Sequence, residues 1–262
     1  SWKTPRTGWH PEVASRHWHQ NDPGVVPNLL HTGAGSPVGI AVYEGQLLPK
    51  RFRGELLHCD AGPRVVRAYP VEPAGAGFTA SIENIVTGED DPWFRPTDVC
   101  VAPDGTLLVS DWYDPGVGGH RAFDDRRGRI FRVLPAGENA GARAAESAGG
   151  YPLTTPSQAA AALKSPNETA RYLAAQALLK AGERSVAELE RLFRDDDPRV
   201  QARALWLLAM LPDSQKYLDE AFDSEDANLR VTGVRAARRV GVEPVEVVQR
   251  LKDDPSAAVR RE

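Results

Sequence analysis

RPTDVCVAPDGTLLVSD, residues 95–111, is the stretch that decides the fold of this chain. Two short, largely apolar runs lie on either side of the turn Pro103-Asp104-Gly105. Apolar residues that alternate with a period of two are typical of a half-buried strand, and a turn of this composition joins strands into a hairpin. The stretch therefore predicts two antiparallel strands.

An earlier part of the chain repeats this pattern. Three strand-like segments, SPVGIAV (36–42), GELLHCD (54–60) and RVVRAYP (64–70), recur in the same order as RPTDVCV (95–101), GTLLVSD (105–111) and RIFRVLP (129–135). FTASIENIVT (78–87) predicts a fourth strand in the first copy. A repeated unit of about 50–60 residues with about four strands is typical of a β-propeller blade.

Two blades do not close a propeller, which needs roughly four to eight. They would leave open sheet edges and half a core. The chain also begins at Ser1, without an initiator Met and without the layout of a signal peptide. It ends on VRRE (259–262), at the start of a predicted helix. We therefore expect a fragment, cut at both ends, of a longer protein.

From about residue 136 onward, the composition shifts to Ala, Leu, Arg, Glu and Asp with helical spacing. Four dipeptides recur at intervals of 30, 29 and 30 residues: Ala170-Arg171, Val200-Gln201, Leu229-Arg230 and Val259-Arg260. The small and apolar residues that follow each complete copy predict the buried face of a first helix. Second helices are predicted over VAELERLF (186–193), QKYLDEAF (215–222) and PVEVVQRL (244–251). Two helices per repeat of about 30 residues are typical of HEAT-like repeats.

The predicted fold class is therefore multidomain, β then α: a partial β-propeller of about two blades followed by a HEAT-like α-solenoid. The expected parts are a loop-rich N-terminal segment (1–34), two blades (35–135), a flexible linker (136–151) and helical repeats (152–262). The linker is assigned because its residues are small and polar.

Composition limits the classes of function. Apolar residues make up 41% of the 262 positions and charged residues 26%, which suits a packed core. The net charge of -4 offers no overall basic field for a nucleic-acid backbone, and no apolar run reaches the roughly 20 residues that span a membrane. GxGxxG, Walker, GxSxG and HExxH patterns are absent from the sequence, which argues against nucleotide, serine-hydrolase and zincin chemistry.

Side chains that could carry chemistry gather around the second hairpin. The candidates are Arg95 and Asp98 at a strand entrance and Asp111, Trp112, Tyr113, Asp114 and His120 after the next strand. Loops held on a rigid scaffold commonly carry function, so these residues predict a pocket. A purely structural interpretation stays open, in which Asp111 caps a turn while Trp112 and Tyr113 pack between blades.

Metal ligands give only weak signals. Two groups lack a recognised spacing: His10, His17 and His19 near the N-terminus, and Asp111, Asp114, Asp124 and Asp125 around the second hairpin. The residues alone therefore predict no metal site.

The two cysteines, Cys59 and Cys100, each lie inside an apolar run. This position predicts small buried side chains, with a disulfide or metal role as the alternative. No CxxCH is present, so a c-type haem is not attached to this chain.

Three stretches together resemble one protein family. They are GAGSPVGIAVYEGQLLPKRFRGELLHCDAGPRVVRAYPV (33–71), DPWFRPTDVCVAPDGTLLVSDWYDPGVGGH (91–120) and RGRIFRV (127–133). They are similar to the bacterial membrane-bound dehydrogenase family, also called PVC-type haem-binding proteins, which is related to sorbosone and soluble glucose dehydrogenases. The resemblance covers about residues 20–262. It implies a six-bladed propeller, HEAT-like repeats and often a c-type haem domain that carries CxxCH.

The resemblance also implies a cofactor. In the quinoprotein relatives, pyrroloquinoline quinone lies over the propeller channel, held by basic groups and helped by Ca²⁺. Arg95 matches one of these basic positions, with Asp98 as its orienting partner. Thr97 stands where a second basic group is expected, and the lysine of the preceding blade has no match around His58–Gly62. The relatives' catalytic His lies in an earlier blade, so the resemblance implies that this chain is inactive alone.

Two hypotheses follow. In the first, the chain is the C-terminal portion of an extracytoplasmic (periplasmic or membrane-associated) quinoprotein-like dehydrogenase of sugars or alcohols. That enzyme would pass electrons to a c-type haem domain or cytochrome outside this chain. In the second, the propeller and solenoid form a non-catalytic scaffold that binds a glycan or a protein partner. The helical repeats offer a surface for a protein partner in either case.

Overall fold

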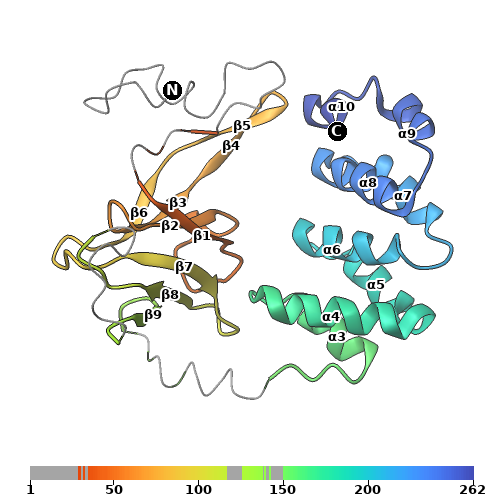
Figure 1. The fold of residues 1–262 in the computed structure, drawn as a ribbon. Helices are drawn as coiled ribbons and strands as arrows, with labels where there is room; N and C mark the ends of the chain where they lie inside the picture. The colour runs from red at the N-terminus through yellow and green to blue at the C-terminus, as the bar shows by residue number, and fades with distance from the viewer. Residues whose placement is uncertain are drawn as a thin grey trace.

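The computed structural model describes residues 29–30, 32, 35–116, 126–137, 139, 142 and 150–262. In Figure 1, β-strands come first along this part of the chain and α-helices follow, stacked beside the sheets. The predicted order, β then α, is therefore confirmed. None of the helices in the described ranges is long and apolar enough to cross a membrane.

The strands form three antiparallel sheets. The first sheet has the order β1-β2-β3-β6, the second sheet has the order β7-β8-β9, and β4 and β5 form a separate hairpin. The bounds are β1 Pro37–Val42, β2 Leu56–Asp60, β3 Val65–Tyr69, β4 Val71–Ala74, β5 Gly77–Ala80, β6 Glu83–Thr87, β7 Pro96–Val101, β8 Leu107–Asp111 and β9 Arg129–Val133, with the 3-10 helix η1 at Lys50–Phe52.

The turn between β7 and β8 forms as its sequence predicts. Gly105 has a φ of 82°, a left-handed conformation that glycine adopts without a steric penalty. The Asp104 carboxylate accepts hydrogen bonds from the backbone N and the hydroxyl of Thr106. The hairpin register then pairs Val101 with Leu107.

The prediction of one continuous strand over 78–87 is wrong. Its first residues belong to β5 and pair with β4, from Val71 opposite Ala80 to Ala74 opposite Gly77. Only β6 joins β3 as the fourth strand of the first sheet. The break arises because the segment after β3 turns back on itself at Gly75, which has a φ of 58°.

In each copy the third strand pairs with the second strand. The two pairings differ by one residue from what the sequence match between the copies predicts. Leu56 pairs with Tyr69 in the first sheet, and its equivalent Leu107 pairs with Val133 in the second. The match of RVVRAYP with RIFRVLP aligns Tyr69 with Leu134 instead. Different connections precede the two strands, a short turn in one copy and a long loop in the other, and turn length sets register.

The first and second sheets pack face to face. In terms of the repeated sequence, the face that the first sheet buries in this contact is opposite to the face that the second sheet buries. Ile40 and Val42 of β1 are 65% and 44% exposed, whereas their equivalents Val99 and Val101 of β7 are 2% and 6% exposed. The shared core contains Leu57, Cys59, Val66 and Ala68 from the first sheet and Val99, Val101, Leu107 and Val109 from the second. Successive side chains of a strand point to opposite faces. Equivalent strands therefore present alternate residues to the same core.

The helices follow the predicted repeat. Their bounds are α3 Pro156–Ala162, α4 Glu168–Ala181, α5 Val186–Phe193, α6 Pro198–Leu208, α7 Gln215–Phe222, α8 Ala227–Val240, α9 Pro244–Leu251 and α10 Ala257–Arg261, with the 3-10 helix η2 at Gly182–Ser185. The second helices predicted over 186–193, 215–222 and 244–251 are α5, α7 and α9. Figure 1 shows the helices stacked in pairs from α3 and α4 to α9 and α10.

Polar side chains in the turns begin the first helix of each copy. Asn167, Asp197 and Asp226 each accept a hydrogen bond from a backbone N–H in the first turn of α4, α6 and α8. An N-cap of this kind is typically worth about 1 kcal/mol. Leucine and alanine side chains on the inner faces form one continuous core along the stack. The caps and this core explain why the sequence spacing identified the helices.

An ion-pair cluster joins the sheets to the helices. Glu44, in the loop after β1, forms ion pairs with arginines of two helices. Its carboxylate lies 2.5 Å from Arg171 Nη2 of α4 and also contacts Arg203 of α6. Asn167 Nδ2 donates to the backbone oxygen of Val101 at the end of β7 (2.7 Å). These contacts place the β7–β8 turn, and not the opposite end of the strands, against the helices.

A second contact lies at the far end of the helical stack. Arg261 of α10 donates to the backbone oxygen of Ala76 in the β4–β5 turn. Figure 1 shows this hairpin extending toward α10. The hairpin that the sequence did not predict thus contacts the last helix.

Candidate functional site

Asp111, the last residue of β8, is the centre of the candidate site. Its Oδ1 accepts hydrogen bonds from the backbone N of Arg95 (2.7 Å) and of Tyr113 (2.9 Å). Its Oδ2 accepts from Nε (2.8 Å) and Nη2 (2.6 Å) of Arg129. The side chain is fully buried. Asp111 therefore caps the turn, as the structural interpretation expected, and its carboxylate is fully engaged.

Asp114 and Trp112 fix the loop that follows. The buried Asp114 carboxylate accepts hydrogen bonds from the backbone N of Gly116 (2.7 Å) and from Trp112 Nε1 (3.1 Å). The Trp112 side chain is 59% exposed. The carboxylate thus orients an indole ring that presents a large part of its surface to solvent.

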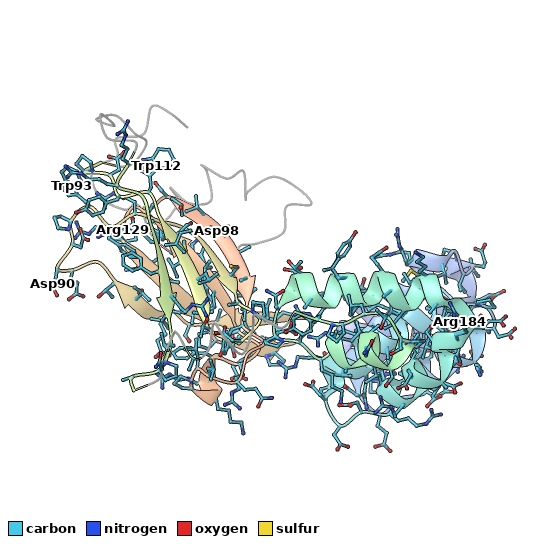
Figure 2. All side chains as sticks on the ribbon, turned by 90° about the horizontal axis from the view of Figure 1, so that it is seen from below. Asp90, Trp93, Asp98, Trp112, Arg129 and Arg184 are labelled. Carbon is cyan, nitrogen blue, oxygen red and sulfur yellow. The ribbon has the colours of Figure 1, made fainter. Side chains whose placement is uncertain are left out.

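Tyr113 lies in an aromatic group with a cation. It has a φ of 54°, an uncommon value for a residue other than glycine. Its ring packs against Trp93 with a centroid distance of 5.5 Å, and the guanidinium carbon of Arg129 lies 3.9 Å from its centroid. Figure 2 shows Trp93, Trp112 and Arg129 together at the end of the sheets that is remote from the helices.

Arg95 is buried, with 7% of its surface exposed. Its Nη1 donates to the backbone oxygen of Phe94 (3.0 Å) and its Nη2 to that of Pro115 (3.2 Å), while its buried Nε has no hydrogen-bond partner among the described residues. Burial lowers the pKa of Arg95, and the charge of Arg64 lowers it further. Within the part of the chain that the structure describes, one N–H of this cation therefore lacks a hydrogen bond.

Asp98 does not orient Arg95. Its Oδ1 accepts from the backbone N of its neighbour Val99 (2.9 Å), and the residue is exposed. Gly39 of β1 passes close by, so that a Cβ on Gly39 would lie 2.5 Å from the Cα of Asp98. The structure places Asp98 at the contact of β1 with β7, apart from Arg95.

Two contributors to the site were not singled out from the sequence. Arg129, the first residue of β9, pairs in register with Asp111 and also donates to Asp91 Oδ2 (2.8 Å). The hydrogen bond from Arg129 lowers the pKa of Asp91. Trp93 donates its backbone N to Asp91 Oδ1 (3.1 Å). The register that brings Arg129 to Asp111 depends on the long β8–β9 connection, and no local motif reveals it.

Several candidates lie outside the described residues: His120, Asp124, Asp125, His10, His17 and His19. Within the described ranges, no three His, Cys, Asp or Glu side chains form a group that could hold a metal ion.

The prediction for the cysteines is half correct. Cys59 is buried, and burial together with the charge of Asp98 raises its pKa to about 12. Cys100 is exposed, so the prediction of a buried side chain is wrong. On β7 the inward positions belong to Val99 and Val101, and the alternation of the strand turns Cys100 to the other face. Both thiols are free.

The residues present fit a quinone contact at one position. The unpartnered Nε of Arg95 is a cationic donor of the kind that carboxylates bind. Thr97, at the second expected position, directs its hydroxyl to the Ser110 hydroxyl (2.9 Å) within the sheet. At the two positions that the resemblance marks, the described residues therefore supply one cationic group, Arg95, and not a complete cofactor site.

One comparison with known proteins gives a match. Residues 8–137 match the family model of a domain of unknown function, DUF7133. The matched range contains all the described strands and the candidate site, and none of the helices from α3 to α10. No curated protein matches the chain.

Proposed function

We propose that this chain is the C-terminal portion of an extracytoplasmic, quinoprotein-like sugar or alcohol dehydrogenase. In this proposal it forms two blades of a β-propeller and a HEAT-like solenoid. Residues outside the chain supply the catalytic base and a c-type haem domain. The quinone, helped by Ca²⁺, would accept the two electrons that no side chain of the chain can take.

The stacking of the two sheets supports the propeller. Each sheet offers one face to each neighbour, and the first sheet buries the face opposite to the one that the second sheet buries. Ile40 and Val42 are the equivalents of Val99 and Val101, which in the second sheet pack against the first sheet. Their exposed side chains form an apolar surface that a preceding blade would cover.

The helical half supports the solenoid. Pairs of helices recur with the spacing of the four dipeptides, and the same polar caps begin α4, α6 and α8. Each pair packs on the next through one continuous core.

The buried Arg95 carries the assignment to a dehydrogenase. Among the described residues, Arg95 Nε lacks a hydrogen-bond partner, as do Arg64 Nε and Arg67 Nε, and such a buried N–H is costly unless a ligand or another group accepts its bond. Of the three, Arg95 is the one at a position where the family resemblance implies a cofactor contact. It lies at the end of the sheets where the strand entrances meet the loops, which is where propellers bind ligands. We propose that Arg95 contacts the anionic cofactor and that Asp98 does not take part.

The test uses the complete protein that contains this chain. With pyrroloquinoline quinone and Ca²⁺ added, it should reduce a dye acceptor when given a sugar or an alcohol. Arg95→Gln should weaken quinone binding, measured by quenching of tryptophan fluorescence, by about tenfold, the loss of one charge-assisted contact. Arg132→Gln, at a second arginine that pairs with Asp104 in the same sheet, is the control and should bind normally. Absence of dye reduction with every substrate, and equal quinone binding by both variants, would exclude this function.

One observation favours a second function, a non-catalytic scaffold that binds a glycan. Trp112 is fixed by Asp114 and largely exposed, and Asp91 and Arg129 provide polar groups nearby. An aromatic face beside such groups suits a sugar ring, which has apolar faces and hydroxyl edges. Glycan binding without quinone, lost in Trp112→Ala and kept in Tyr172→Ala on the exposed side of α4, would support the scaffold. Equal binding by both variants would exclude it.

A further inference from the structure

The helical repeats share an internal hydrogen bond at one position. The second residue of each repeated dipeptide donates to the backbone oxygen six residues earlier: Arg171 to Ser165 (2.9 Å), Gln201 to Asp195 (2.7 Å), Arg230 to Ser224 (2.7 Å) and Arg260 to Asp254 (2.5 Å). The two sets of residues therefore occupy equivalent places in successive repeats.

Between the last two repeats, this position forms a buried ion pair. Arg230 Nε and Nη2 donate to the two carboxylate oxygens of Asp254 (2.7 and 2.9 Å), while its Nη1 also reaches the backbone oxygens of Ser224 and Glu225. The guanidinium and the carboxylate are 11% and 5% exposed. A single arginine thus fills the space between two neighbouring turns.

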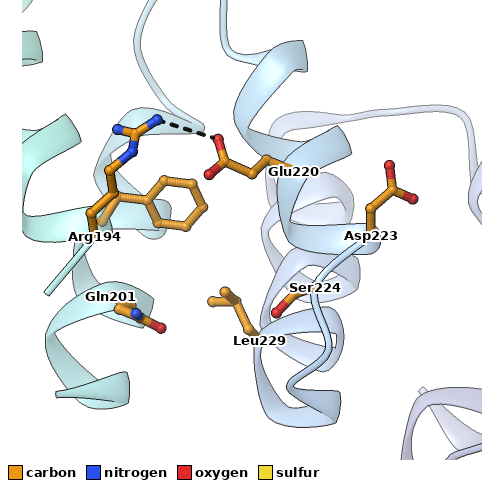
Figure 3. A pocket seen from close by; sticks show the side chains of 7 residues that line it. Arg194, Gln201, Glu220, Asp223, Ser224 and Leu229 are labelled. Carbon is orange, nitrogen blue, oxygen red and sulfur yellow. Dashed lines mark ion pairs between the residues drawn. The ribbon is translucent and has the colours of Figure 1, made fainter. Parts of the chain in front are cut away.

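One repeat earlier, both members of that pair are replaced. Gln201 stands where Arg230 stands, and Ser224 stands where Asp254 stands. Gln201 donates to the backbone oxygen of Asp195, in the turn that precedes its own helix. A pocket of about 530 Å³ is found at this place, lined by both residues (Figure 3).

The lining of the pocket combines two apolar side chains and two carboxylates, and Arg194 lines it as well. Phe193 and Leu229 line it and are 4% and 9% exposed. Glu220 and Asp223 also line it, and their side chains are 52% and 73% exposed. Figure 3 shows these side chains around one hollow, with Ser224 between Asp223 and Leu229.

The cations nearby leave Glu220 weakly paired. Arg194, at the edge of the pocket, places Nη2 3.9 Å from Glu220 Oε2, close to the limit of an ion pair. Arg250, which does not line the pocket, forms an ion pair with Asp223 at a distance of 2.7 Å. The Glu220 carboxylate therefore keeps capacity for another donor.

We propose that this pocket binds an arginine side chain of a protein partner. The guanidinium would occupy the place that Arg230 fills one repeat later, with Glu220 and the Ser224 hydroxyl as acceptors. Its methylene groups would lie against Phe193 and Leu229. This proposal goes beyond the dehydrogenase function and does not rest on it, since the pocket lies on α5 to α8 and contains none of the residues assigned to the cofactor.

Arginine suits the site better than lysine because the pocket is equivalent to the place that the Arg230 guanidinium fills one repeat later. A guanidinium offers five N–H donors in a fixed fork, whereas an ammonium group offers a compact point charge. In this chain the equivalent space is filled by an arginine that bonds to four acceptors at once.

The full chain provides the test. A fluorescein-labelled peptide with one arginine in a Gly-Ser background is titrated, and its anisotropy is measured beside that of the lysine peptide. The double variant Gln201→Arg/Ser224→Asp rebuilds the ion pair of the next repeat and fills the pocket without changing net charge. We expect it to weaken arginine-peptide binding by about tenfold or more, because the charge-assisted bonds are lost.

Two further variants separate this site from general attraction to acidic surfaces. Glu220→Gln should weaken binding, whereas Asp253→Asn, at a carboxylate that is 91% exposed in a different turn, should not. In two-dimensional NMR, the side-chain amide of Gln201 should shift on addition of the arginine peptide, and circular dichroism checks that the variants fold. Equal binding of the arginine and lysine peptides, or equal binding by wild type and the double variant, would overturn the proposal.

Discussion

At the scale of single residues, the loop after β8 depends on one buried carboxylate. Asp111 accepts two backbone hydrogen bonds and two from Arg129, and its side chain has no contact with solvent. Removal of this carboxylate leaves the backbone N–H groups of Arg95 and Tyr113 without their acceptor, and it leaves Arg129 with Asp91 as its remaining carboxylate partner. The conformation of Tyr113, with its positive φ, depends on the same oxygen.

Asp111→Ala should therefore lower the free energy of unfolding by about 3 kcal/mol, as expected when one partner of a buried ion pair is removed. Urea titration followed by circular dichroism measures this change. Asp90→Ala, at an exposed carboxylate in the preceding turn, should change the stability by less than about 0.5 kcal/mol. Similar values for the two variants would contradict the role given to Asp111.

The two thiols should differ sharply in reactivity. Iodoacetamide reacts with the thiolate, and the exposed Cys100 should be alkylated in the folded protein while the buried Cys59 should not. Burial raises the pKa of Cys100 and, more strongly, that of Cys59. A raised thiol pKa means less thiolate at neutral pH, so the Cys100 rate should keep rising through pH 9. Mass spectrometry of peptides locates the label; labelling of Cys59 in the native state would contradict the burial.

At the scale of elements, the helical repeats are held by caps and by the buried arginine position. The hydrogen bond from Arg230 lowers the pKa of Asp254 below its ordinary value of 3.8. A carboxylate whose pKa is lowered by folding stabilises the fold above its unfolded pKa, and this contribution is lost as the pH falls through its folded pKa. The ion pair between α8 and the α9–α10 turn therefore acts at neutral pH and weakens in acid.

Arg230→Gln places a glutamine in the third repeat, at the position where the second repeat has Gln201. We expect a loss of about 3 kcal/mol at pH 7, since a buried carboxylate loses its partner. The difference from wild type should begin to shrink as the pH falls below the ordinary pKa of 3.8, where this carboxyl is protonated in the unfolded chain, and should be lost as the pH falls through the lowered pKa of Asp254 in the wild-type fold. Urea titrations at pH 7 and pH 3 measure both values. Arg235→Gln, on the exposed side of α8, is the control and should cost much less; an Arg230 variant with a pH-independent loss would contradict the ion pair.

The helices were predictable because their signals are local. Leu189, Leu192 and Phe193 are buried in α5 at the spacing of one helix face, and each turn carries its own capping residue. The strand positions of the hairpin 95–111 were predictable for the same reason: a turn with Gly105 lies between two apolar runs.

The rest depends on distant pairing. The β4–β5 hairpin divides the segment 78–87 because Val71 pairs with Ala80, a choice that neither residue reveals alone. Arg129 reaches Asp111 only through the register of β9. Burial of Cys59 and exposure of Cys100 follow from which face of each sheet meets the other, and both sit in equally apolar runs.

At the scale of the whole molecule, Glu44 joins the two halves. Its carboxylate is 12% exposed and lies between the guanidinium groups of Arg171 and Arg203. Without it, two cations from α4 and α6 would face each other at a site with little water. Burial already lowers the pKa of Arg203, and the carboxylate of Glu44 opposes this shift.

Glu44→Gln should lower the melting temperature and separate the unfolding of the sheets from that of the helices. Differential scanning calorimetry should show one transition for wild type and two for the variant, because the carboxylate compensates both arginines. Glu72→Gln, at an exposed position in β4, should leave the single transition unchanged. A single transition at the wild-type temperature in Glu44→Gln would contradict this coupling.

The contact between the two sheets has a consequence for symmetry. It joins unlike faces of equivalent units, which makes it heterologous, whereas a two-fold dimer interface joins a surface to itself. The operation that carries one sheet onto the next can be applied again, and it ends only when a ring closes. If the exposed Ile40 face of one molecule met the Cys100 face of another, the product would be a ring of several molecules where the rotation closes, or a filament where it does not, and not a symmetric pair.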